Sequence, residues 1–472
     1  MARPRYPRPW ADKTRGMLTA GRALAAVLVL ALFGPALPPA VAQTPDVRAI
    51  ARDGFIYGYP LVLMEVTRRI VTQSAPVGTF VHMLSGPTPP FRIVVAPNGD
   101  TRYSSAWVDV SQEPQVLHVP DPSGRYFVAE IMDAWTDVIA DPTTRIPSAA
   151  PADYAIVGPG WKGTLPPGVR IVRSPTNVVW VLARTRNNAS DDPAAITAIQ
   201  QQYRIVPLSH FGDPGFQAPP GIMRDPNIDT GPTPPSIVAG LSGPAFFNLL
   251  AAALVKNPPL AADAPMVARL AQIGVVAGKP LDANAMDPAV RSALDAGVRD
   301  GVTLLQSYDP PQVRHQNGWR WTAPETGRFG TNYAYRAYIA ATLLAANLPE
   351  DAVYPETAVD ASGAPLGGEH RYVMHFAAGN LPPVNGFWSL TLYSPDHYLT
   401  PNAIDRYTLR DRALRRNADG SIDVAIQHDP PTGDQTNWLP APAGPFVVTL
   451  RMYWPLPAAV DGTYRIPAIE RS

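Results

Sequence analysis

Proline restricts how this chain can fold more than any other residue. The sequence contains 56 prolines among 472 residues. Each proline lacks a backbone N–H and holds φ at about −65°, so prolines suit connections and sheet edges better than helix interiors. We therefore expect long ordered connections and sheet edges more than extended helix. Hydrophobic residues make up 46% of the chain, which is enough for a packed core and excludes disorder.

The first 42 residues have the pattern of a secretory signal peptide. Five basic residues within positions 3–15 precede an apolar run at 23–33, and Ala40-Val41-Ala42 offers the small residues of a cleavage site. Cleavage after Ala42 would leave a periplasmic or secreted chain that begins at Gln43. The apolar run is shorter than the roughly 20 residues that cross a bilayer, so we predict no transmembrane helix.

Residues 43–472 are too many for one hydrophobic core, which usually organises roughly 250–300 residues, so two or more domains are expected. They carry 33 Lys and Arg against 38 Asp and Glu, a formal charge of about −5. Surfaces that bind nucleic acid are normally basic, so nucleic acid is excluded as a partner. The chain has no cysteine, which excludes disulfides, zinc–thiolate sites and thiol nucleophiles.

The hydrophobic pattern changes twice along the chain. Asp46 is a candidate N-cap for a helix over 46–70, which Pro60 would kink or divide into two. Asp191-Asp192-Pro193 opens a further helix that ends at Tyr203. Alternating or β-branched runs predict strands at 92–95, 105–110, 126–133, 154–157, 169–172, 178–182, 371–377, 386–393, 422–428 and 446–453. A period of 3.6 residues predicts helices at 237–255, 266–275, 290–305 and 333–344.

This order indicates an α+β multidomain chain with two antiparallel β domains, each barrel-like or sandwich-like, and helical segments at the N-terminus and between them. The predicted division is a signal peptide at 1–42, short helices with a β domain at 43–190, a mostly helical segment at 191–347 and a second β domain at 348–472. The helices of 236–346 could form a dimer contact, which would make the protein a homo-oligomer, or an internal brace.

Polar residues form a first candidate site in two stretches, Asn98-Gly99-Asp100-Thr101-Arg102-Tyr103 and Asp133-Ala134-Trp135-Thr136-Asp137. If the strand that begins at Phe127 continued to Asp137, two carboxylates and Trp135 would share one apolar face. Such carboxylates are either hydrogen-bonded or perturbed in pKa, and perturbed acids gather at functional sites. The alternative is that Asp100 and Asp133 accept backbone N–H groups in turns and only lock loops.

Aromatic and basic side chains of the last third form a second candidate set: Trp388, Tyr393, Arg406, Tyr407, Arg412, His428, Trp438, Arg451 and Trp454. They could line a pocket that stacks on a ring and pairs with a carboxylate or phosphate. The alternative is a core of aromatic side chains with an internal ion-pair network around Arg406 and Arg412. No cofactor site is predicted, since the glycine-rich run at 158–163 cannot open a helix. No metal site is predicted either, because His370 and His375 would point to opposite faces of one strand.

Long motifs at both ends of the chain carry a family resemblance. The N-terminal ones lie at 57–60, 97–107, 133–137 and 173–177, and the C-terminal ones at 386–390, 402–407, 437–442 and 451–455. Together they resemble the bacterial family of exported proteins that pair a domain of unknown function, DUF1254, with a second one, DUF1214. The resemblance implies two β domains with helical segments. It brings no established catalytic residues, so the function must be argued from the residues themselves.

Two classes of function remain open. The first is a cofactor-independent hydrolase that acts on a small molecule, with Asp100 or Asp133 as general base and Tyr103 as proton donor. Its ligand-binding residues would be Asn98, Trp135, Asp137, Trp388, Arg406, Trp438 and Arg451. The alternative is a non-catalytic periplasmic ligand-binding or envelope-associated protein, in which the same residues shape a pocket or hold loops. The hydrolase predicts that Asp133→Asn loses turnover and still folds, and the alternative predicts a change in stability or affinity alone.

Overall fold

The structure, a computed structural model, describes residues 45–92, 96–187, 193–218, 231–322 and 324–472. The predicted signal peptide at 1–42 lies outside these residues, as do most of the predicted strand at 92–95 and the acidic start of the helix at 191–203. In the described part of the chain, no helix combines the length and the apolar character that a membrane crossing requires.

The first β-rich region forms two stacked sheets, which we call the N-terminal sandwich. One sheet has the strand order β1-β2-β8-β4-β5 and the other β7-β6-β3-β9. Their strands are β1 (Val81–His82), β2 (Thr101–Asp109), β3 (Gln115–Val119), β4 (Phe127–Asp133), β5 (Val138–Ala140), β6 (Ala152–Val157), β7 (Arg170–Arg173), β8 (Val178–Arg186) and β9 (Arg204–Pro207). Apolar side chains from both sheets, among them Val108, Leu117 and Ile156, form the core between them.

The sheet that contains β8 is buried on both faces, which explains why this strand is a nearly continuous apolar run. Val179, Val181 and Ala183 belong to the core of the sandwich. Trp180 and Leu182 belong to a second core on the opposite face, which the sheet shares with helices. Because successive side chains of a strand point to opposite faces, β8 contributes to both cores.

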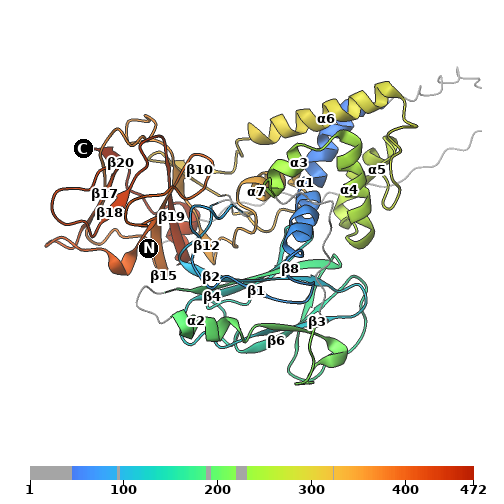
Figure 1. Cartoon of the computed structure of the whole chain (residues 1–472), viewed down its shortest axis with the longest axis horizontal. Helices are drawn as coiled ribbons and strands as arrows, with labels where there is room; N and C mark the ends of the chain where they lie inside the picture. Colours follow the sequence, from blue (N-terminus) through green and yellow to red (C-terminus); the bar gives the residue numbers. More distant parts are fainter. Residues whose placement is uncertain (1–44, 93–95, 188–192, 219–230, 323) are drawn as a thin grey trace, which may run out of the picture. The chain divides into compact units, whose positions relative to one another are not determined.

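Helices from two distant parts of the chain cover that opposite face and form the helical layer (Figure 1). They are α1 (Val47–Val71), α3 (Pro234–Ala239), α4 (Gly243–Lys256), α5 (Ala264–Gln272), α6 (Pro288–Gln306) and α7 (Tyr333–Thr342). Helix α1 contacts each of the others. Two more helices, α2 (Pro193–Gln200) and α8 (Pro457–Asp461), and the 3-10 turns η1 (Leu208–His210), η2 (Ala261–Asp263) and η3 (Asp411–Ala413) lie outside this layer or at its edge.

Helix α1 runs without a break over 25 residues. Of the two predicted forms, a kinked helix or two short ones, the division into two helices is therefore wrong. Asp46 caps it as expected, since its Oδ1 accepts a backbone N–H of the first turn at 3.0 Å. Pro60 stays inside the helix because every residue from 54 to 64 is buried, and this packing offsets the hydrogen bond that proline cannot make. The contact with α6 is close, since a Cβ on Gly297 would lie 2.5 Å from Arg48 O.

The second β-rich region also forms two stacked sheets, the C-terminal sandwich (orange to red in Figure 1). One sheet has the order β10-β11-β13-β19-β15-β16, with β12 also paired to β19, and the other has β18-β17-β14-β20. The strands are β10 (Arg314–Gln316), β11 (Trp319–Trp321), β12 (Ala352–Val353), β13 (Glu356–Thr357), β14 (Tyr372–Phe376), β15 (Val384–Tyr393), β16 (Thr408–Arg410), β17 (Ile422–Gln427), β18 (Trp438–Pro440), β19 (Val447–Pro455) and β20 (Ile469–Arg471). Leu390, Val424 and Leu450 lie in its core.

The predicted fold class is confirmed, because the structure contains two mostly antiparallel β regions with helices before and between them. Both β regions are sandwiches, which decides between the two forms that the sequence left open. The predicted strand at 126–133 agrees with β4. The condition for a shared face is not met, because the strand that begins at Phe127 does not continue to Asp137. Strand β4 ends at Asp133, and Thr136 takes a φ of 72° in the turn that follows. Trp135 and the two carboxylates therefore do not share a strand face.

Candidate functional site

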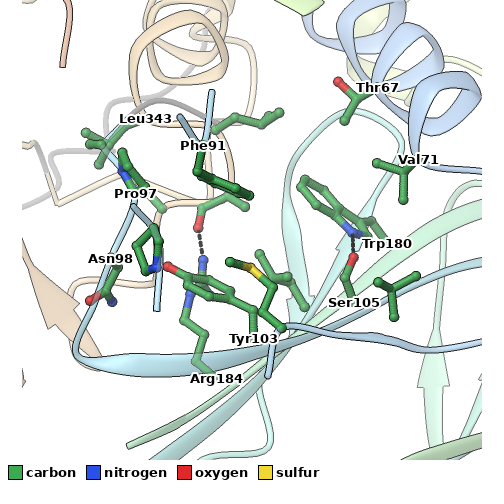
Figure 2. A pocket seen from close by; sticks show the side chains of 18 of the residues that line it. Thr67, Val71, Phe91, Pro97, Asn98, Tyr103, Ser105, Trp180, Arg184 and Leu343 are labelled. Atoms are coloured by element: carbon green, nitrogen blue, oxygen red, sulfur yellow. Dashed lines mark hydrogen bonds between the residues drawn. The ribbon is translucent and has the colours of Figure 1, made fainter. Parts of the chain in front are cut away.

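A cavity of about 260 Å³ lies among the C-terminal end of α1, the helix-facing side of the N-terminal sandwich and β19 of the C-terminal sandwich (Figure 2). Its wall is mostly apolar and comes from segments far apart in the sequence: Ile70, Val71, Val81, Met83, Phe91, Trp180, Leu182, Leu343 and Leu344. Apolar walls favour an apolar ligand, and a few polar groups among them then orient it.

Alternate residues of β2 and β8 form the side of the cavity made by the sheet. Tyr103 and Ser105 come from β2, and Trp180 and Arg184 come from β8, with Tyr103 directly opposite Arg184 in the antiparallel register. Trp180 donates its indole N–H to Ser105 Oγ at 2.8 Å, as Figure 2 shows. The Arg184 guanidinium lies 5.4 Å from the centroid of the Tyr103 ring. Polar groups therefore interrupt the apolar wall at defined positions on a rigid sheet.

Arg184 is held by a buried ion pair behind the cavity wall. Its Nη1 lies 2.7 Å from Glu130 Oε2, and the two side chains are 6% and 1% exposed. Its Nη2 donates to Ala345 O, which follows α7. Burial raises the pKa of Glu130 to about 7, although the charge of Arg184 opposes that shift. Both terminal nitrogens of Arg184 are therefore already bound to protein groups.

Arg451, on β19, is the other arginine of the wall, and its surroundings differ. The residue is 3% exposed, and its Nη2 donates to Ala96 O at 3.0 Å and to the Tyr393 hydroxyl. Both acceptors are neutral. Among the described residues, its Nη1 has no hydrogen-bond partner. A buried guanidinium without a counter-charge is unfavourable, so this side chain is suited to an anionic group of a ligand.

The fold brings three of the predicted site residues together at this cavity: Asn98, Tyr103 and Arg451. Asp100 lies outside the wall and is 1% exposed. Its Oδ2 accepts from the hydroxyls of Ser389 and Tyr453, and its Oδ1 pairs with Arg410 Nε at 3.0 Å. One alternative predicted that Asp100 accepts backbone N–H groups in a turn, but among the described residues only side chains contact its carboxylate. Asp100 joins the N-terminal sandwich to the C-terminal sandwich.

Asp133, Trp135 and Asp137 lie in a different place, beneath the helical layer. Asp133 Oδ1 accepts the backbone N–H groups of Trp135 and Asp137 at 2.9 and 3.0 Å, as the turn alternative predicts. The Trp135 ring is fully buried, 4.9 Å from the ring of Tyr57 and 5.2 Å from the guanidinium of Arg336. Asp137 Oδ2 lies 3.5 Å from Arg336 Nη1. This turn locks the end of β4 against the helices.

We expect Asp133→Asn to stabilise the protein at neutral and alkaline pH. Burial, together with the nearby charge of Asp137, raises the pKa of Asp133 above its ordinary value of 3.8, so the folded state favours the protonated acid. The contribution of the Asp133 carboxyl group to the free energy of unfolding therefore falls as the pH rises from about 4 to the raised pKa. The fall is about 1.4 kcal/mol per pH unit. Asparagine keeps an oxygen for both N–H groups and removes this dependence. Urea unfolding at pH 4, 6 and 8 measures the difference.

Asp121→Asn is the matched control for this prediction. Asp121 is exposed and also accepts a backbone N–H two residues ahead, from Ser123 at 2.8 Å, so its replacement should change stability little at any of the three pH values. A lower free energy of unfolding for Asp133→Asn at pH 8 would show that the charged carboxylate is needed in the folded protein.

The remaining predicted residues, Trp388, Arg406 and Trp438, line neither the cavity of about 260 Å³ nor a second one beside β3 and β9. Trp388 is buried in the core of the C-terminal sandwich, 4.9 Å from the ring of Phe376. Arg406 Nη1 donates to the backbone carbonyls of Gln435 and Trp438, and the Trp438 indole donates to a backbone carbonyl as well. These residues hold strands and loops together, so of the four ligand-binding residues predicted in the last third only Arg451 reaches the cavity.

Several wall residues were not among the predicted ones, namely Trp180, Arg184 and the segment 343–346. The sequence could have indicated Arg184, because this charged residue follows six apolar residues in what is a buried strand. No signal existed for 343–346, since its place in the wall depends on how the helical layer packs on the sheet.

A second cavity of about 440 Å³ lies beside β3 and β9 and includes three histidines in its wall, His82, His118 and His210. Each of them already has a hydroxyl or carboxylate partner. Within the described ranges, no group of three or more His, Asp or Glu residues could hold a metal ion.

Comparisons with known proteins identify two domain families and a solved structure with the same fold. Two family models match the chain, "Protein of unknown function (DUF1254)" at residues 77–207 and "Protein of unknown function (DUF1214)" at 351–457. The crystal structure of the VPA0106 protein from Vibrio parahaemolyticus is similar over 90% of this chain and 100% of that chain, with 24% identity and a TM-score of 0.66, a likeness that shows the fold alone. An uncharacterized protein from Burkholderia cenocepacia is 14% identical, with 89% of this chain and 88% of that chain covered and a TM-score of 0.44. No curated protein matches the chain.

Proposed function

Because the chain belongs to the family of proteins that pair a DUF1254 domain with a DUF1214 domain, both of unknown function, we propose a function from the cavity itself. The protein binds a small, largely apolar molecule there and does not convert it. The observation that carries this proposal is the wall, in which apolar side chains from α1, β8 and the segment after α7 surround a few fixed polar groups. Export is part of the proposal on the pattern of residues 1–42, and N-terminal sequencing of the periplasmic protein tests it.

The hydrolase that the sequence also suggested has less support. A general base must lie within hydrogen-bond reach of the water or substrate that it activates. Neither Asp100 nor Asp133 belongs to the described wall of the cavity, and each is 1% exposed. The oxygens of Asp100 already face Ser389, Tyr453 and Arg410. These contacts favour a structural role for both carboxylates and a binding role for the cavity.

We expect Val71→Phe to weaken the binding of an apolar probe by at least about tenfold. Val71 lines the cavity and is labelled in Figure 2, and a phenyl ring there would occupy part of a volume of only about 260 Å³. Losing about 1.4 kcal/mol of contact with the probe corresponds to a factor of ten in Kd. Calorimetric titration with 1-octanol measures this effect.

Val77→Phe is the control for this experiment. It makes the same change six residues along the chain, at a side chain that is 39% exposed and outside the wall, and should leave the affinity for 1-octanol as it is in the wild type. Equal affinity of Val71→Phe and the wild type would refute binding in this cavity, as would the absence of any binding to the wild type.

A further inference from the structure

We infer that the ligand of the cavity is a monocarboxylate with an apolar body, whose carboxylate pairs with Arg451 while the body lies along the wall formed by α1 and β8. This inference rests on the proposed function, because it assigns a chemical class to the molecule that the cavity binds. It is independent of whether the protein is exported.

The charges around the cavity leave one positive charge without a partner. Arg184 is neutralised by Glu130 at 2.7 Å. The one carboxylate of the described wall, Glu356, pairs with Arg320 at 3.3 Å, outside the wall. Asp100, whose charge also acts on Arg451, pairs with Arg410 at 3.0 Å. Once these pairs are assigned, Arg451 is left with neutral acceptors only.

The unfavourable free energy of burying the Arg451 guanidinium without a counter-charge indicates that the ligand is an anion. Arg451 is 3% exposed, so water cannot replace the missing counter-charge, and a buried charge that is neither paired nor fully hydrogen-bonded is strongly unfavourable. The hydrogens of Nη1 are left over among the described residues. A carboxylate brings one negative charge to this one positive charge, and its hydrogen bonds to guanidinium are of the strong, charge-assisted kind. A doubly charged phosphate ester would exceed the available charge.

Size and polarity define the rest of the ligand. The cavity of about 260 Å³ equals roughly nine water-sized volumes of about 30 Å³ each, which suits a chain of medium length. Tyr103 and Asn98 also line the cavity, and in Figure 2 the Tyr103 hydroxyl points toward the side where Pro97 and Asn98 lie. Ala96 directly precedes Pro97 and Asn98, and its carbonyl oxygen accepts the hydrogen bond from Arg451 Nη2. Asn98 and the Ala96 carbonyl that holds Arg451 therefore lie at one end of the cavity, and Val71 and Trp180 lie on the other side of it in Figure 2.

The test compares octanoate with 1-octanol, which have the same apolar chain and differ in the charged end. We expect calorimetry on the full-length protein to show that the wild type binds octanoate at least about tenfold more tightly than 1-octanol, a factor that corresponds to about 1.4 kcal/mol. Arg451→Gln should abolish this preference. Arg451→Lys should retain part of it. Arg328→Gln is the control, because Arg328 lies outside the cavity wall in an exposed ion pair with Glu350. This variant should behave as the wild type.

The outcomes separate this inference from the proposed function. Equal affinities of the wild type for octanoate and 1-octanol would overturn the carboxylate assignment and leave apolar binding in place. An unchanged preference in Arg451→Gln would likewise overturn the role of Arg451. Binding of neither probe to the wild type would reject both proposals. If Arg451→Gln does not fold, the wild-type comparison and Arg451→Lys still decide the question.

Discussion

Replacing Arg184 with methionine is expected to lower the free energy of unfolding by about 3–5 kcal/mol, because it leaves the Glu130 carboxylate buried without a counter-charge. Arg184 Nη1 lies 2.7 Å from Glu130 Oε2, and the Glu130 side chain is 1% exposed. Methionine has a similar length and an apolar surface, so the change tests the charge more than the packing. Equilibrium unfolding in urea, followed by circular dichroism, measures the loss.

The loss in Arg184→Met should depend on pH. In the wild type the pKa of Glu130 is raised from its ordinary value of 4.5 to about 7, so the folded state binds the proton more tightly than the unfolded state does. This group's contribution to stability therefore falls as the pH rises from 4.5 to 7. Without Arg184 the carboxylate is still harder to ionise. The deficit relative to the wild type should thus be largest above about pH 7 and smaller at about pH 5, where protonated Glu130 needs no cation.

Two further variants make this prediction decisive. The double variant Glu130→Gln with Arg184→Met removes both charges and should recover most of the loss, since a buried pair can often be replaced by neutral groups. Arg328→Met removes the exposed pair with Glu350, in which the side chains are 53% and 36% exposed, and should cost about 0–1 kcal/mol. A loss in Arg184→Met no greater than that in Arg328→Met would contradict the assigned role of the buried pair.

Asp100→Ala is expected to destabilise the protein by about 3–5 kcal/mol, because it removes the acceptor of two hydroxyl groups and the counter-charge of one guanidinium. The hydroxyls belong to Ser389 and Tyr453, and the guanidinium, which forms an ion pair with Asp100, belongs to Arg410. All three belong to the C-terminal sandwich, and Asp100 directly precedes β2 of the N-terminal sandwich. The loss should therefore also weaken the coupling of the two sandwiches. Differential scanning calorimetry is expected to resolve a broader or divided transition.

Asp109→Ala is the matched control, since Asp109 ends the same strand that Asp100 precedes. Its carboxylate pairs with Lys256 at 2.7 Å, with side chains that are 28% and 57% exposed, so its removal should cost about 0–1 kcal/mol and leave one sharp transition. Similar losses in the two alanine variants would mean that the contacts of Asp100 contribute little more than an exposed pair. In the hydrolase alternative, Asp100→Ala would instead abolish turnover while stability changed little.

The two acidic motifs show where sequence reasoning succeeds and where it stops. For Asp133, a turn-locking role was one of the predicted alternatives, and the N–H groups that it accepts lie two and four residues away in the sequence. For Asp100, the predicted turn did not describe the contacts, because its partner Ser389 lies 289 positions away. Local hydrogen bonds follow from residue type and spacing, whereas a contact between two sandwiches does not.

The sequence by itself determined the family, the α+β class and the position of most strands and helices, because hydrophobic periodicity and turn residues act over a few neighbouring positions. Only the tertiary structure decided which charges are neutralised. Asp100, Glu130, Arg184 and Arg451 are all chemistry-bearing residues in the sequence, but the first three have partners of opposite charge and Arg451 does not. That difference arises at the cavity, which segments of both sandwiches and α1 line together, since Arg451 and the Ala96 carbonyl that holds it are 355 positions apart. No local pattern encodes such a contact, and it is this contact that defines the candidate site.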